Sequence, residues 1–172
     1  NEVLIVNRAF KQAMAQYGQY GPNIGKSDTQ TWETYVADVL GTLVALPQSK
    51  FQRNLVDSGI CSGANWGYYT QQDGGEMSAS LSASPEKIVQ AVDALKTELQ
   101  KWDDPGYFTK EELIAAKRQL EVSSTFSRES GQEFAVNLAF WWAVAGIDYY
   151  LDYIPNIKKV TLKDLSNFAA KW

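Results

Sequence analysis

The amino-acid sequence predicts an α+β fold, a two-layer sandwich in which helices cover a mainly antiparallel β-sheet. Two observations predict this class. Extended segments open the chain and a hairpin pattern follows the first helical pattern, whereas the second half is a run of helical patterns. Strands and helices do not alternate regularly, as they would in a doubly wound sheet. Hydrophobic residues make up 45% of the chain, which is enough to bury a core.

The length of 172 residues falls within the range of one domain, so residues 1–172 are expected to form a single domain. The chain begins with Asn1 rather than with methionine. We therefore expect it to be a fragment of a longer multidomain protein, from which any targeting signal has been removed.

Residues 3–6 and 12–20 are predicted to be extended, because β-branched or alternating residues are typical of strands. A helix over residues 29–46 follows, with Ser27 or Asp28 as its N-cap. Its apolar residues recur at helical spacing, which indicates a helix that lies on the core. They are Trp32, Tyr35, Val36, Val39, Leu40, Leu43 and Val44.

A short helix over residues 49–57 is expected to stop at Gly59. Residues 60–72 and 76–84 then predict a hairpin around Asp73-Gly74-Gly75. In its second strand apolar residues alternate with serines, which gives one apolar face and one face of small hydroxyl groups. The apolar residues are Met77, Ala79, Leu81 and Ala83, and the serines are Ser78, Ser80, Ser82 and Ser84.

The rest of the chain predicts helices, whose starts carry capping residues. They begin at Ser84-Pro85, at the capping box Thr109–Glu112, at Glu133 and at the cap-like Thr161–Asp164, and a further helical segment reaches about Tyr153. The adjacent tryptophans Trp141 and Trp142 cannot both face one side of a helix, so at least one is expected to point away from the core.

The composition argues against several classes of function. The net charge of −4 provides no basic patch, so neither nucleic acid nor an anionic membrane is an expected partner. No apolar run approaches the ~20 residues that span a bilayer. The chain has no histidine, which removes the commonest general base and the commonest zinc ligand.

The remaining candidates for chemistry each have a simpler structural interpretation. Ser84 to Lys87 matches an S-x-x-K pattern, but its serine is also a capping residue. The acidic pairs Asp103-Asp104 and Glu111-Glu112 lie where helix ends favour carboxylates. The single cysteine, Cys61, has no histidine to activate it. As an enzyme on its own, the chain lacks a recognisable catalytic group.

Four segments in order resemble the insulinase (pitrilysin) family of zinc metalloproteases, which includes mitochondrial processing peptidase. They are LVDSGI at 55–60, SPEKI at 84–88, FTKEELIAAKRQLE at 108–121 and IKKVTLKDL at 157–165. Such proteases carry an H-x-x-E-H zinc motif on the first helix of the catalytic domain and pair it with copies of the fold that have lost the motif. The resemblance implies a fold of the mitochondrial processing peptidase type.

The matching helix, residues 29–46, contains Glu33 and Asp38 but no histidine, and two carboxylates cannot build the zinc site alone. The resemblance therefore implies a non-catalytic domain without metal or cofactor. Zinc would belong to a catalytic domain in the same polypeptide or in a partner chain. The L-V-x-S-G sequence at residues 55–59 resembles the second domain of long bacterial members of the family, which are often exported to the periplasm. The resemblance therefore implies a bacterial, periplasmic parent protein.

Non-catalytic partners in this family often supply an arginine and a tyrosine to the substrate. At those positions this chain has Val56 and Ser62, and Tyr68 or Tyr69 remains open as a replacement. The resemblance thus implies a domain that helps to enclose and position a peptide. Residues expected to face the substrate chamber are Tyr68, Tyr69, Ser78, Ser80 and Ser82.

Alternatives remain open. The serines could simply form the solvent face of an antiparallel sheet. The whole domain could be a structural or assembly subunit derived from the same protease fold. An autonomous enzyme with a mechanism that needs no histidine is the third possibility.

Overall fold

The computed structural model describes residues 3–6, 11–25 and 27–172. Its sheet contains β1 (Val3–Val6), β2 (Ala13–Tyr20), β3 (Gly63–Tyr69) and β4 (Glu76–Ala83). The strand order is β1-β2-β4-β3, and each neighbouring pair is antiparallel. The prediction of an antiparallel sheet is confirmed, and the hairpin strands are shorter than the sequence pattern indicated.

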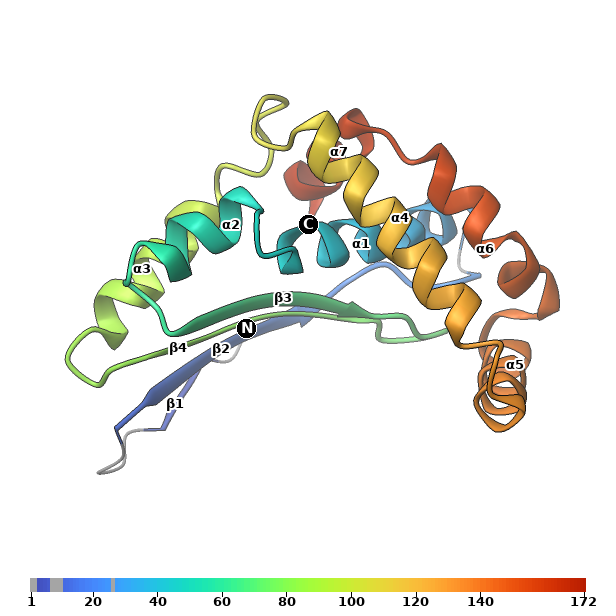
Figure 1. The fold of residues 1–172 in the computed structure, drawn as a ribbon, viewed down its shortest axis with the longest axis horizontal. Helices are drawn as coiled ribbons and strands as arrows, with labels where there is room; N and C mark the ends of the chain where they lie inside the picture. Colours follow the sequence, from blue (N-terminus) through green and yellow to red (C-terminus); the bar gives the residue numbers. More distant parts are fainter. Residues whose placement is uncertain (1–2, 7–10, 26) are drawn as a thin grey trace.

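All the helices that pack on the sheet lie on one side of it (Figure 1). The helical segments are α1 (Asp28–Ala45), α2 (Lys50–Gln52), the π-helical η1 (Arg53–Asp57), α3 (Ile88–Leu99), α4 (Lys110–Phe126), α5 (Gly131–Ala145), α6 (Ile147–Lys159) and α7 (Leu162–Lys171). Helix α4 lies over α1 as a further tier, and α5 stands beyond one end of the sheet (Figure 1). The prediction of helices covering a sheet is thus confirmed.

Helix α1 is the central element of the core, as its apolar stripe predicted. The Ser27 hydroxyl accepts a hydrogen bond from the backbone N–H of Gln30 and so caps the first turn. Val36, Val39 and Leu43 are fully buried between the sheet and α4. Leu40 and Val44 of the same stripe are also fully buried, as the helical spacing of the apolar residues predicts.

The predicted capping box at Thr109 is present, and the predicted cap-like start at Thr161 is a capping box as well. In α4 the Thr109 hydroxyl accepts from the N–H of Glu112, while the Glu112 carboxylate accepts from the N–H of Thr109. Thr161 and Asp164 make the same reciprocal pair at the start of α7. Each box satisfies backbone donors that a helix start otherwise leaves free.

Two helix boundaries differ from the prediction. Ser84 does not cap α3: residues 84–87 form a turn in which the Lys87 N–H donates to the Ser84 carbonyl at 2.9 Å, and the helix begins at Ile88. Helix α6 does not end near Tyr153 but continues through Pro155 to Lys159. Burial of Ile157 beyond the proline provides contacts that outweigh the lost backbone hydrogen bond.

Aromatic side chains fill the space between the sheet and the helices. The Trp66 and Trp102 rings meet edge to face with centroids 5.7 Å apart, and Phe51 packs on Trp102 at 5.6 Å. Trp141 packs against the core, whereas Trp142 is 72% exposed, so the prediction that one of them points away is confirmed. Among the described helices, none combines the length and the apolarity that a bilayer crossing requires.

Candidate functional site

We call the face of the sheet opposite the helices the open face, and none of the described helices packs on it (Figure 1). It consists of Met14, Gln16, Gly18 and Tyr20 on β2, Asn65, Gly67 and Tyr69 on β3, and Glu76, Ser78, Ser80 and Ser82 on β4. The sheet is curved, and the open face is on its concave side (Figure 1). The three serines are partly exposed, while Met77, Ala79 and Leu81 between them are buried under the helices.

The middle of the open face is formed by small residues. Ser78 lies opposite Gly18 of β2 on one side and opposite Gly67 of β3 on the other. Ser80 lies between Gln16 and Asn65. Because Ser78 is flanked by two glycines, another backbone can approach the sheet closely at this position. The serine hydroxyls can donate and accept hydrogen bonds there without selecting a charge.

Aromatic residues border this surface at one end. Tyr20 and Tyr69 lie on either side of Glu76, and they are 80% and 56% exposed. The Tyr69 ring also contacts the Phe140 ring of α5, with centroids 6.5 Å apart. The open face is therefore continuous with α5 at this end.

Tyr68 lies on the other face of the sheet, beside Met77, because neighbouring residues of a strand point in opposite directions. Its hydroxyl donates to the carbonyl of Pro22 at 2.7 Å, and burial raises its pKa. Tyr68 thus anchors the segment before α1 and does not join Tyr69 and the serines. The sequence pattern did not separate the two tyrosines, because the hairpin register decides which one faces the helices.

Val56 and Ser62, which the sequence resemblance aligns with the family's arginine and tyrosine positions, make local contacts. Val56 is partly buried in η1. The N–H and the hydroxyl of Ser62 both donate to the carbonyl of Ser82, at 2.8 and 3.1 Å. These contacts extend the β3–β4 pairing by one residue.

The carboxylates of α1 are engaged with other groups. Glu33 forms an ion pair with Lys171 at 2.7 Å and accepts a hydrogen bond from the indole of Trp172. Asp38 accepts from the Tyr153 hydroxyl at 2.8 Å, and burial raises its pKa to about 7. Within the described part of the chain, no three histidine, cysteine or acidic side chains gather as a metal would require. The donor set of α1 therefore does not fit the zinc site that the family's catalytic domains carry.

The other sequence candidates occupy structural positions. The Lys87 amine donates to the carbonyl of Gly59 rather than facing Ser84. Glu112 accepts from the N–H of Lys50 in addition to its capping bonds. Asp104 accepts from the N–H of Gly106 within a turn. Cys61 is buried, and burial raises the pKa of its thiol, which opposes formation of the reactive thiolate.

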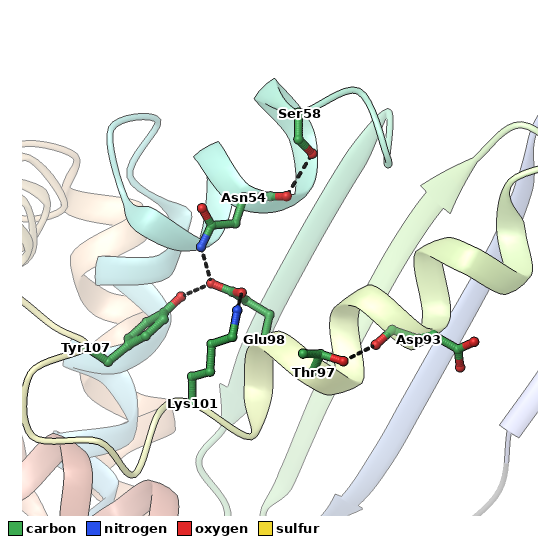
Figure 2. Close-up of polar contacts among 7 residues, drawn as sticks. All are labelled: Asn54, Ser58, Asp93, Thr97, Glu98, Lys101 and Tyr107. Atoms are coloured by element: carbon green, nitrogen blue, oxygen red, sulfur yellow. Dashed lines mark hydrogen bonds and ion pairs between the residues drawn. The ribbon is translucent and has the colours of Figure 1, made fainter.

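A buried carboxylate that the sequence did not reveal is Glu98 of α3 (Figure 2). It accepts hydrogen bonds from the Tyr107 hydroxyl at 2.5 Å, from the Asn54 amide at 2.6 Å and from the Lys101 amine at 2.9 Å. Burial by itself raises the pKa of Glu98, but these three donors outweigh it and hold the pKa below its usual value. Because its two oxygens accept three hydrogen bonds from donors on η1 and on the loop after α3, Glu98 connects these segments to α3.

An apolar cavity of about 480 Å³ opens between α3 and α7 on the helix-covered side of the sheet. Val92, Leu95 and Trp172 line it, and its few polar residues include Gln19 and Lys96. Lining residues such as Ala15, Met77 and Ala79 belong to the covered face, so the cavity lies on the side of the sheet away from the open-face serines.

Comparisons with known proteins agree with this geometry. Residues 1–120 match the family model described as the peptidase M16 inactive domain. None of the curated proteins matches the chain. Among solved structures, the inactive peptidase domain of a proposed zinc protease from Bordetella parapertussis superposes with a TM-score of 0.82 at 18% identity, covering 96% of this chain and 88% of that one.

Two further structures show the fold within longer chains. A protease from Helicobacter pylori gives a TM-score of 0.80 at 19% identity, covering 96% of this chain but 39% of its own length. The periplasmic protease PqqL from Escherichia coli gives 0.60 at 10% identity, covering 95% of this chain and 18% of its own length. On the strength of the matching family model, the chain belongs to the insulinase-type peptidase M16 family and is one of its inactive domains.

Proposed function

We propose that this chain helps to enclose and position a peptide substrate for a catalytic zinc-peptidase domain. The observation that carries the proposal is the open face, an uncovered concave surface of small hydroxyls and glycines in an inactive peptidase domain. A surface of this kind can contact the substrate backbone or the catalytic domain without taking part in bond cleavage. The residues assigned to the contact are Tyr69, Ser78, Ser80 and Ser82.

Enclosure can contribute to catalysis without any reactive group. Holding a peptide in the geometry of attack removes translational and rotational freedom before the chemical step, and a misplacement of about 1 Å can cost roughly a hundredfold in rate. Small hydroxyls suit many peptide sequences, because they can hydrogen-bond the substrate main chain without selecting its side chains. Tyr69 would supply the aromatic contact to the substrate, because the position of the family's substrate-contacting tyrosine holds Ser62 in this chain.

We also propose that residues 1–172 form one domain of a longer parent protein. The supporting observation is that related chains, such as that from Helicobacter pylori, are more than twice as long as the part that this chain covers. The catalytic H-x-x-E-H domain and its zinc would lie in the same polypeptide or in a partner chain. The likeness to PqqL, a periplasmic protease, favours a bacterial periplasmic location for the parent.

The test is Ser80→Arg in the full-length parent protease, measured by its melting temperature and by kcat/KM on an unfolded protein substrate. We expect an unchanged melting temperature and a loss of at least about tenfold in kcat/KM, because the long cation would occupy the space of the substrate or the catalytic domain. Ser123→Arg is the matched control, since Ser123 is exposed on α4, away from the open face.

Equal activity of the Ser80→Arg and Ser123→Arg proteins, both folded, would contradict the proposal. The open face would then be an ordinary solvent face. An assembly role for the domain would become the better explanation of a peptidase fold without a catalytic centre.

A further inference from the structure

The hairpin formed by α5 and α6 is attached to the rest of the molecule by few side chains. Helix α5 has no buried residue, although it is rich in apolar side chains. Helix α6 buries Tyr149 and Ile157. The position of the whole hairpin therefore depends mainly on the contacts that α6 makes with α1 and α4.

Two tyrosine hydroxyls of α6 bond to side chains of α1. The Tyr149 hydroxyl shares a hydrogen bond of 2.8 Å with the fully buried Thr34, and its ring stacks on Tyr35 with centroids 4.8 Å apart. One turn later, the Tyr153 hydroxyl donates to the Oδ2 atom of Asp38 at 2.8 Å. The second bond places a carboxylate in the contact between the two helices.

The surroundings of Asp38 disfavour its negative charge. The titratable groups that face it are Tyr35 on α1, Tyr149 and Tyr153 on α6 and Tyr68 on β3. Asp152 of α6 adds a second negative charge near Tyr35. None of the ion pairs in the described part of the chain involves Asp38. Burial raises the pKa of Asp38 from 3.8 to about 7, although the hydrogen bond from Tyr153 acts in the opposite direction.

We propose that Asp38 is a proton-dependent latch that holds the α5–α6 hairpin onto α1. When Asp38 is protonated, α6 packs against α1 without burying a charge. When Asp38 is ionised, opening the contact returns the carboxylate to water, so the open state gains population. The contacts that support the latch do not depend on the proposed function of the open face.

The direction of the pH effect follows from proton binding. The docked state binds the proton of Asp38 more tightly than an open, hydrated state, whose aspartate titrates near 3.8. Docking is therefore favoured most at low pH, weakens as the pH rises from about 4 to about 7, and is constant above that range. A single group changes such an equilibrium by at most about tenfold per pH unit.

Movement of the latch would change the surroundings of the open face. Helix α5 carries exposed apolar side chains, among them Val136, Phe140 and Trp142. Phe140 contacts Tyr69 at the border of the open face. Loosening α6 would therefore displace the apolar helix that lies next to the aromatic end of this surface.

The test is hydrogen–deuterium exchange of the full chain at pH 5.5 and pH 8, expressed as protection factors so that the intrinsic pH dependence of exchange is removed. We expect protection of residues 131–159 to fall about tenfold at pH 8, and protection of α3 to stay constant. The factor stays near tenfold because Asp38 is only partly buried as a residue. Asp38→Asn should abolish the pH dependence, whereas the exposed Asp152→Asn should retain it.

A second variant tests the latch even where Asp38→Asn fails to fold. Tyr153→Phe keeps the ring but removes the donor that favours ionised Asp38, so the midpoint of the protection profile should move to higher pH. Wild-type protection that does not change with pH would overturn the proposal. So would an Asp38→Asn profile equal to that of the wild type, or a Tyr153→Phe midpoint that does not move.

Discussion

Strand β4 presents two different surfaces from alternating residues. Met77, Ala79, Leu81 and Ala83 are almost completely buried against the helices, whereas Ser78, Ser80 and Ser82 on the open face are partly exposed. On the covered face, close packing restricts volume and polarity at each position. None of the described helices packs on the open face, so helix packing does not explain the small size of its serines. The comparison indicates that the stability of the domain depends on the covered face.

The largest expected effect comes from placing a charge on each face in turn. Leu81→Asp should lower the free energy of unfolding by about 4 kcal/mol, because Leu81 is 2% exposed and the new carboxylate would be buried among apolar side chains. Ser82→Asp, the next residue in the strand, should cost less than about 1 kcal/mol. Urea unfolding of both variants measures the difference. Similar losses in the two proteins would break the distinction between the faces.

Glu98 of α3 is a carboxylate that is already buried on the covered side of the sheet, and its removal tests whether that side depends on hydrogen bonds as well as on apolar packing. Glu98→Ala should cost about 3 kcal/mol, because it leaves the Tyr107 hydroxyl and the Asn54 amide without their acceptor (Figure 2). The control is Asp93→Ala in the same helix, whose side chain is exposed and which should change stability by less than about 0.5 kcal/mol. Thermal or urea unfolding gives both values. Equal effects would show that the three donors around Glu98 contribute no stability.

The smallest expected effects concern two glycines. A Cβ atom on Gly67, on the open face, would meet no atom within 4 Å, so Gly67→Ala should stabilise the domain by about 0.5 kcal/mol through a less flexible unfolded chain. A Cβ atom on Gly75 would lie 2.4 Å from the Pro22 carbonyl oxygen, so Gly75→Ala should destabilise it by about 1–2 kcal/mol. Opposite shifts in melting temperature are the expected result. Destabilisation by Gly67→Ala would mean that the backbone at Gly67 is more restricted than the open space around its Cβ position indicates.

The order of elements could be predicted because each carries a local signal. The stripe of α1, the alternation of β4 and the capping boxes at Thr109 and Thr161 all follow from backbone geometry over a few residues. Local signals failed at Ser84, which precedes a turn rather than capping a helix, and at Pro155, which α6 accommodates. At Pro155 tertiary contacts outweigh the local preference, whereas at Ser84 a local turn with a hydrogen bond from the Lys87 N–H takes the place of the cap.

The sequence by itself determined that the chain lacks histidine, that an apolar helix and a serine-faced strand are present, and that the strands pair in an antiparallel sheet. Only the tertiary structure decided that Tyr69 joins the serines while Tyr68 lies under the helices, because the register of the hairpin assigns the faces. It also decided that Asp38 meets Tyr153, 115 positions away, and that Glu98 meets Asn54 and Tyr107. Periodicity records which way a side chain points along its own element, but the partner across a contact depends on how separate elements pack together.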